Sequence, residues 1–415
     1  MKKWLYSLLR KSESYTKTDM VYLAEGGFWL TVGQAVASGA ALLISIAFAN
    51  LLPPETYGIY RYIISIGSLI LITTLTGVDA AVTQSVARGY EGALPIGVKI
   101  KMKWGCIGTL VALAIGVYYF LQGNSTLAIS FGVVSLFMPF SESFDVYNAF
   151  LTGKKLFGIQ TIYGIIRKIV YIVAIVGTLF LTDNVYTIIS VYFLSLTIPA
   201  LIFLFITYKK YKANDSRDTD MVSFGKNLSI VHLLSLVAME LDKILVFQYV
   251  GAVDLAVYAL AIAPADQIKG LFKNVNALAM PQFAQRNVEE IKAAIRKKLK
   301  ILFLAVSSIV FVYILLASPF FEIFFPKYLA SVPYSQVLAL SVIPVVVTGL
   351  LYTILEAQKA QKELYQHSIY SNVLNLVILF PLVYYFGIWG AVGARFVTRV
   401  FALGLTTFLV RKLPE

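Results

Sequence analysis

Long runs of apolar residues alternate with short polar segments along almost the whole chain. Each run holds roughly 20 residues, which as an α-helix is long enough to cross the ~30 Å hydrocarbon core of a membrane. A spanning β-barrel would need short strands of alternating polarity instead, so the predicted fold class is an all-α polytopic membrane protein. The pattern predicts twelve transmembrane helices, at about residues 25–52, 58–80, 104–121, 126–151, 157–181, 185–208, 225–250, 254–280, 299–318, 333–355, 366–386 and 388–410.

A short turn separates the first two runs. The helix that ends at Leu52 cannot continue through Pro53 and Pro54, because proline lacks the backbone N–H and its ring clashes with the preceding turn. Gly58 follows within the same segment, which reads Leu-Pro-Pro-Glu-Thr-Tyr-Gly-Ile-Tyr from Leu52 to Tyr60. We predict that this segment connects two membrane helices outside the membrane.

The two halves of the chain align with each other. Residues 25–88 match residues 223–286 without a gap at a displacement of 198 positions (223 − 25), and the shared residues include Tyr60/Tyr258, Ala81/Ala279, Gln84/Gln282 and Arg88/Arg286. Six spans in each copy give both copies the same orientation, so we expect two six-helix lobes, related by an axis along the membrane normal, around a central cavity. The expected parts are a cytoplasmic N-terminal segment (1–24), an N-terminal lobe (25–208), a cytoplasmic linker (209–224), a C-terminal lobe (225–410) and a cytoplasmic tail (411–415).

Composition supports a membrane protein, and the charges orient it. Hydrophobic residues make up 59% of the 415 residues, 14% are charged, and the mean hydropathy is +0.77. The net charge of +13 comes from Lys and Arg residues that concentrate in connecting segments on one side of the membrane. One of these segments, Glu289 to Lys300, is predicted to form an amphipathic surface helix. The positive-inside rule then predicts a multi-pass protein of the cytoplasmic (inner) membrane with cytoplasmic N- and C-termini, and no nucleic-acid partner.

The sequence contains no recognisable catalytic or metal-binding constellation. Cys106 is the only cysteine, and the two histidines, His232 and His367, lie far apart in the sequence. We find no phosphate-binding glycine loop and no candidate triad, and the predicted outer loops are too short to build a domain. We therefore expect a transporter rather than an enzyme, without a cofactor or a metal.

Ionisable residues inside the apolar runs are the candidate functional residues. A charge at mid-membrane costs ~3 kcal/mol or more unless it faces a cavity or a partner. Arg395 and Arg399 share one helix face at i and i+4 and repel each other, so they require an anion or an acidic partner. The candidate basic residues of the cavity are Arg61, Arg167, Lys168, Lys243, Arg395 and Arg399, and the candidate coupling or cavity acids are Asp242, Asp266, Glu142 and Asp145.

Each of these charges also has a structural alternative. A buried ion pair, or a side chain that reaches back to the membrane surface, would place a charge in an apolar run without any role in transport. Asp266 and Lys269, at i and i+3, can pair with each other.

Several segments together resemble the polysaccharide transporter family, the O-antigen and lipid-linked oligosaccharide flippases of the multidrug/oligosaccharidyl-lipid/polysaccharide exporter superfamily. They are the glycine-rich first span, the turn from Leu52 to Tyr60, Gly77-Val78-Asp79, Asp242, and the segment from Gly251 to Tyr258. The resemblance implies two six-helix lobes that form a V around a central cavity and alternate between inward-open and outward-open states. It also implies transport of polyprenyl-diphosphate-linked sugar units from the cytoplasmic to the outer leaflet.

The expected function is therefore a lipid-linked oligosaccharide flippase, in which the six candidate basic residues are expected to bind the diphosphate and sugar in the cavity. Its expected partners are the polyprenyl-diphosphate-linked oligosaccharide and membrane lipid, with polysaccharide polymerase machinery left open. A cation-coupled multidrug exporter of the same superfamily is the nearest alternative, although it would favour acidic cavity residues. A membrane glycan polymerase or ligase would usually carry a large outer loop, and a scaffolding protein would need no buried charges.

Overall fold

Helices and short connections build the part of the chain that the structure describes. The computed structural model describes residues 20–272, 279–280, 283 and 288–413, and these contain no strand. The helices are α2 (Met20–Leu51), α3 (Pro54–Ile70), η1 (Leu71–Thr74), α4 (Gly77–Ala87), α5 (Ala93–Leu121), α6 (Ser125–Ser141), α7 (Val146–Gly153), α8 (Phe157–Leu181), α9 (Val185–Lys210), α10 (Met221–Tyr249), α11 (Ala252–Leu271), α13 (Val288–Phe324), η2 (Pro326–Tyr328), α14 (Ser331–Leu340), α15 (Val342–Ala357) and α16 (Gln361–Arg411).

Every predicted span has a helical counterpart, so the prediction of an all-α polytopic membrane protein is confirmed. Within the described part, nine helical segments are long and apolar enough to cross a membrane. Helix α16 covers two predicted spans, and non-helical backbone angles at Gly387 (φ 55°, ψ −129°) separate them at the predicted position. The last part of the span predicted at 254–280 lies outside the described residues, as do the N-terminal segment up to residue 19 and the repeat position Arg286.

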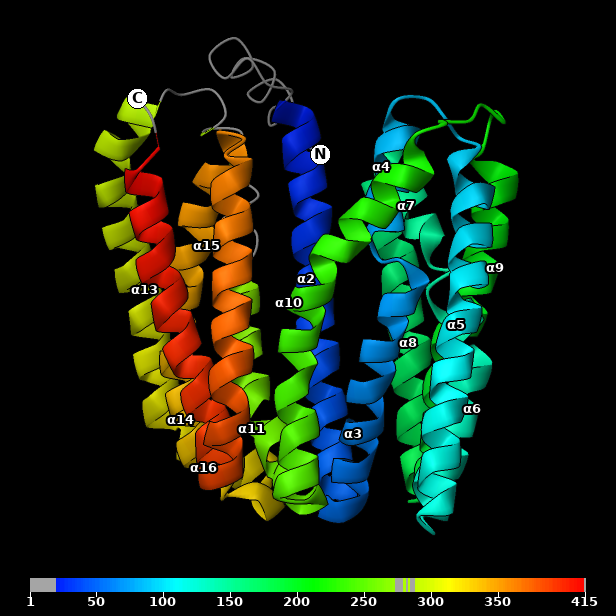
Figure 1. The fold of residues 1–415 in the computed structure, drawn as a ribbon, viewed down its shortest axis with the longest axis vertical. Coiled ribbons are helices and arrows are strands. Elements are labelled where there is room, and N and C mark those ends of the chain that lie inside the picture. Colours follow the sequence, from blue (N-terminus) through cyan, green and yellow to red (C-terminus); the bar gives the residue numbers. More distant parts are fainter. Residues whose placement is uncertain (1–19, 273–278, 281–282, 284–287, 414–415) are drawn as a thin grey trace.

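The helices run side by side along the long axis of the molecule. Figure 1 shows α4 to α9 gathered on one side and α13 to α16 on the other, with α2, α10 and α11 between them. The two ends of the described chain lie at the same end of the bundle (Figure 1). The turn between α2 and α3 and the turn between α10 and α11 both lie at the opposite end, as the repeat predicts.

Glycines allow the first and second halves of the chain to touch at two levels. A Cβ atom at Gly58 would collide with the carbonyl oxygen of Ala252, so the two repeated turns pack directly against each other. Near the other end of the bundle, the backbone N–H of Gly77 donates to Ser229 Oγ at 2.9 Å. A Cβ at Gly77 would lie 2.5 Å from the carbonyl oxygen of Gly225, so α4 and α10 approach backbone to backbone.

The non-helical connection between α9 and α10, residues 211–220, is tied to the turn between α4 and α5. Ser216 O accepts from the Gly92 N–H at 2.9 Å, and Asp218 Oδ2 accepts from Ser85 Oγ at 2.7 Å. Glu91 accepts from the Lys154 ammonium and from the Ala213 N–H. Burial by itself raises the pKa of the Glu91 carboxyl, but these donors outweigh it and hold the pKa below its usual value.

The charged segment predicted at residues 289–300 is helical, and it forms the first part of α13, a single helix of 37 residues from Val288 to Phe324. The charged segment meets the apolar segment at Lys300 and Ile301. Neither proline nor glycine occurs on either side of this junction, so the helix continues through it without a break.

Candidate functional site

A basic cavity of about 290 Å³ lies between α10, α11 and α16, and α3 contributes one side chain to it. Five cationic side chains line it against one acidic side chain, Asp266; the cations are Arg61, Lys243, Lys269, Arg395 and Arg399. Serine, threonine and asparagine complete its polar wall, with Ser235, Asn372, Asn375 and Thr398. The cavity therefore carries a net positive charge and suits an anion.

Arg395 is held in place by a buried carboxylate. Its Nε donates to Asp242 Oδ2, and the same oxygen accepts from the Tyr258 hydroxyl at 2.6 Å. The other oxygen of Asp242 accepts from the Lys243 backbone N–H at 2.8 Å, and Asp242 is only 1% exposed. The Arg395 guanidinium also lies over the Tyr258 ring, 5.7 Å from its centre. Asp242 thus positions Arg395, which in turn borders the cavity.

Arg399 lies one helical turn further along α16 and is bound differently. Its guanidinium donates to Ser341 Oγ at 2.5 Å, and within the described residues it makes no ion pair with a carboxylate. A hydroxyl cannot neutralise a guanidinium, so most of the positive charge of Arg399 remains available to an anion in the cavity.

Two further cations bring the halves of the chain together at this cavity. Lys243 pairs with Glu240 at 2.6 Å, and the charge of Glu240 also acts on Arg61. Arg61 lies on α3, one helical turn after Gly58. The close packing at Gly58 therefore positions the Arg61 side chain at the cavity. Its Nε atom is buried and finds no hydrogen-bond partner among the described residues.

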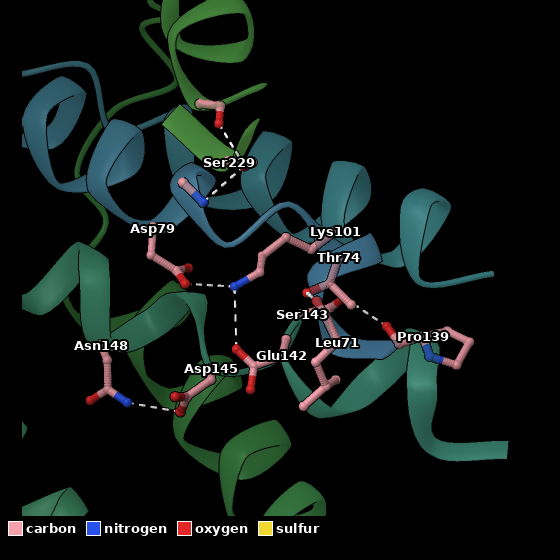
Figure 2. A network of polar contacts seen from close by, with 12 residues as sticks. Leu71, Thr74, Asp79, Lys101, Pro139, Glu142, Ser143, Asp145, Asn148 and Ser229 are labelled. Carbon is pink, nitrogen blue, oxygen red and sulfur yellow. Dashed lines mark hydrogen bonds and ion pairs between the residues drawn. The ribbon is translucent and has the colours of Figure 1, made fainter. Parts of the chain in front are cut away.

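A second cluster of charges lies within the first half of the chain (Figure 2). Lys101 on α5 contacts Asp79 on α4 at 2.6 Å and Glu142, at the end of α6, at 3.6 Å. Arg167 on α8 pairs with Asp145, which also accepts from Asn148 Nδ2 at 2.8 Å. We call these five ionisable residues the paired cluster: Asp79, Lys101, Glu142, Asp145 and Arg167.

Local backbone chemistry shapes the acidic side of the paired cluster. Pro139 lies inside α6 and has no N–H to offer the carbonyl of Ser135, which accepts instead from Thr109 Oγ1 at 2.8 Å. The helix ends soon after the proline, and α7 begins only at Val146. Glu142 and Asp145 lie at this break, where their side chains can turn towards α5 and α8.

The structure thus divides the predicted site residues into two groups. Arg61, Lys243, Asp266, Arg395 and Arg399 border the basic cavity, with Asp242 directly behind it. Arg167, Glu142 and Asp145 belong to the paired cluster and do not border this cavity. Lys168 lies beside Arg167 on α8 and makes no hydrogen bond or ion pair with any residue that the structure describes.

Sequence reasoning missed Lys101. It was assigned to a connecting segment because the third span was expected to begin at residue 104, whereas α5 begins at Ala93 and buries Lys101 completely. A signal was present in the sequence, since the buried face of α5 carries small residues at helical spacing on both sides of Lys101: Gly97, Gly105, Gly108, Ala112 and Gly116.

Comparison with known proteins shows which family the chain belongs to. The family model described as polysaccharide biosynthesis protein matches residues 23–287, more than half of the chain. The chain belongs to this family. The expected family is therefore confirmed, while a search among curated proteins finds no match.

Several solved structures share the fold of this chain. An inward-facing multidrug resistance MATE family transporter of the MOP superfamily matches with a TM-score of 0.69 and 13% identity, over 93% of this chain and 98% of the other. The lipid II flippase MurJ in an inward closed conformation has a TM-score of 0.66 and 14% identity, over 94% and 88%. A MOP superfamily transporter from Pyrococcus furiosus, described as having a binding pocket of reverse polarity, has a TM-score of 0.63 and 15% identity, over 94% and 95%.

Proposed function

We propose that this protein is a flippase that moves a polyprenyl-diphosphate-linked oligosaccharide across the membrane by alternating access. The observation that carries the proposal is the basic cavity, in which cations from α3, α10, α11 and α16 face one space. The family, and a fold shared with a protein described as a lipid II flippase, support the same class of substrate.

The cavity offers a diphosphate the contacts that it needs. Guanidinium groups bind phosphate oxygens through charge-assisted, often bidentate hydrogen bonds, which are stronger than neutral ones. Arg399 has a hydroxyl as its hydrogen-bond partner and Arg61 has a buried Nε without one among the described residues, so both can bind an anion without first breaking an ion pair of their own. The polyprenyl tail can remain in lipid beside the two halves while the polar group enters the cavity.

Direction and location complete the proposal. We place the chain ends on the cytoplasmic side of the inner membrane, as the positive-inside rule requires, so that the substrate moves from the cytoplasmic to the outer leaflet. Arg61, Lys243, Arg395 and Arg399 would bind the diphosphate, and Asp266 would balance part of their charge. In this proposal the acids of the paired cluster stabilise the first half of the chain rather than bind the substrate.

The experiment is a leaflet-crossing assay with the purified protein in vesicles and a labelled prenyl-diphosphate-linked sugar. We expect Arg61→Gln and Arg399→Gln to slow crossing at least about tenfold, because each removes a charge-assisted hydrogen bond worth about 1.5–3 kcal/mol. Arg411→Gln, at the exposed end of α16, is the matched control and should cross at the wild-type rate. Full activity in both cavity variants would refute the proposal.

The multidrug exporter remains the rival function because one of the similar folds reported above is a multidrug resistance MATE family transporter. Such an exporter would bind organic cations, which five cationic side chains in one cavity repel. The same vesicles loaded with a fluorescent organic cation separate the two functions, since a flippase should leave its distribution unchanged.

A further inference from the structure

A second cavity adjoins the basic cavity and differs from it in chemistry. It encloses about 470 Å³ between α15 and the first half of α16, and Ser235 and Asn372 line both cavities. Among its described lining residues there is no Lys or Arg. Hydroxyl groups dominate instead, together with one carboxylate, Glu356, one imidazole, His367, and one phenol, Tyr352. We call it the hydroxyl pocket.

Two hydroxyl groups in this pocket lack partners in the described structure. Ser371 Oγ and Thr348 Oγ1 are buried and make no hydrogen bond to any described residue, and Ser371 is only 8% exposed. Thr353, which lines the same pocket, instead bonds to its own helix: its Oγ1 donates to Gly349 O at 2.9 Å. A buried hydroxyl without a partner is unfavourable, so both groups are suited to a ligand that brings hydroxyls of its own.

The imidazole and the phenol form one end of the pocket. His367 Nδ1 is hydrogen-bonded to Thr406 Oγ1 at 2.8 Å, which leaves Nε2 as the ring nitrogen that Thr406 does not engage. The centre of the His367 ring lies 5.1 Å from the centre of the Tyr352 ring, and the two ring planes are inclined at 59°, so the rings form an angled, partly polar wall. Rings of this kind pack against the apolar face of a sugar while hydroxyls and amides bond to its edge.

The two cavities differ in the charge of the side chains that line them. The Glu356 carboxylate accepts hydrogen bonds and repels phosphate, whereas the basic cavity attracts phosphate. A diphosphate in the basic cavity carries the prenyl chain on one side and the first sugar on the other. The boundary that both cavities share is formed by Ser235 and Asn372, whose polar side chains suit the sugar rather than the prenyl chain.

We propose that the hydroxyl pocket binds the uncharged sugar residue attached to the diphosphate, with Glu356, Ser371 and His367 as its hydrogen-bonding groups. The inference rests on the proposed function, because it assumes that the diphosphate occupies the basic cavity. It assigns the C-terminal half of the chain a two-part site in which one part recognises charge and the other recognises hydroxyls.

The test measures the affinity of the full-length protein in lipid nanodiscs for two probes. One is a short prenyl diphosphate, and the other is the same compound carrying one N-acetylhexosamine. We expect Glu356→Gln and Ser371→Ala each to weaken binding of the sugar-bearing probe about five- to tenfold and to change binding of the sugar-free probe less than about twofold. Arg399→Gln should weaken both probes.

Matched controls separate a sugar contact from a general disturbance. Glu322→Gln and Ser308→Ala change the same residue types at exposed positions of α13 that line neither cavity, and should leave both affinities unchanged. Equal weakening of both probes by Glu356→Gln and Ser371→Ala, or no weakening of either, would overturn the hydroxyl pocket as a sugar site. If Arg399→Gln changes neither affinity while Glu356→Gln weakens only the sugar-bearing probe, the diphosphate assignment fails and the sugar pocket stands.

Discussion

The paired cluster in the first half of the chain and the basic cavity in the second half use charge in opposite ways. In the paired cluster, Lys101 and Arg167 each contact a carboxylate, and the Lys101 side chain is fully buried. In the basic cavity, five cations face one acid; Lys243 and Arg395 pair with carboxylates outside the cavity lining, whereas Arg399 has only a hydroxyl as its hydrogen-bond partner among the described residues. A cation inside an apolar run of this protein is therefore either neutralised by a carboxylate or left facing a cavity, depending on the side chains that pack beside it.

The energetic consequence differs between the two regions. Removing one member of a buried ion pair leaves the other charge uncompensated, which is strongly destabilising. Removing a cation that faces a polar cavity relieves repulsion from its neighbours and costs mainly the binding of an anion. Stability measurements and binding measurements should therefore separate the two regions.

The largest effect is expected at the paired cluster. Lys101→Met leaves Asp79 and Glu142 without their shared cation and should lower the free energy of unfolding by about 3–5 kcal/mol. Thermal unfolding in detergent measures it, and Lys103→Met, at an exposed position on the same helix, serves as the control. Equal unfolding temperatures for the two variants would remove the distinction between the regions.

The second-largest effect on stability is expected at Gly58, whose close packing positions Arg61 at the basic cavity. Gly58→Ala places a methyl group against the backbone of Ala252 and should cost about 1–3 kcal/mol of stability. Gly67→Ala, on the same helix α3, meets nothing within 4 Å and should be tolerated. A Gly58→Ala variant as stable as Gly67→Ala would show that the two turns do not need this close contact.

A smaller effect on stability is expected at the basic cavity. Arg399→Gln loses one hydrogen bond to Ser341 and should change the free energy of unfolding by about 1 kcal/mol or less, while binding of a prenyl diphosphate falls about tenfold. Arg167→Gln should show the reverse, with lower stability and unchanged binding. Calorimetry on both variants measures the two quantities, and the same pattern in both would contradict the comparison.

The smallest effect concerns pH at the connection between the halves. Because the pKa of Glu91 lies below its usual value of 4.5 in the folded protein, its contribution to stability is present above that value and is lost as pH falls through the lowered pKa. Glu91→Gln should therefore flatten the acid side of the profile of unfolding temperature against pH. A variant profile that matches the wild-type profile below pH 4.5 would contradict this expectation.

Local patterns along the chain were enough to predict the helices. Apolar runs of membrane-spanning length, the proline turn after Leu52 and the glycine break at Gly387 depend only on neighbouring residues, and all three have their expected counterparts. The same patterns marked six basic residues as candidates for one site, and the structure places four of them, Arg61, Lys243, Arg395 and Arg399, beside one cavity, but not Arg167 and Lys168. Their roles in binding stay predictions.

Tertiary structure alone decided which of these charges meet. Asp242 and Arg395 are 153 positions apart, and Lys101 and Asp79 are 22 apart, so no local pattern could assign either pair. The hydroxyl pocket was equally hidden, because serine and threonine are common in apolar helices and most of them bond to their own backbone. Whether a polar side chain inside the membrane is neutralised or left for a ligand depends on what packs beside it, and packing joins residues that the sequence keeps far apart.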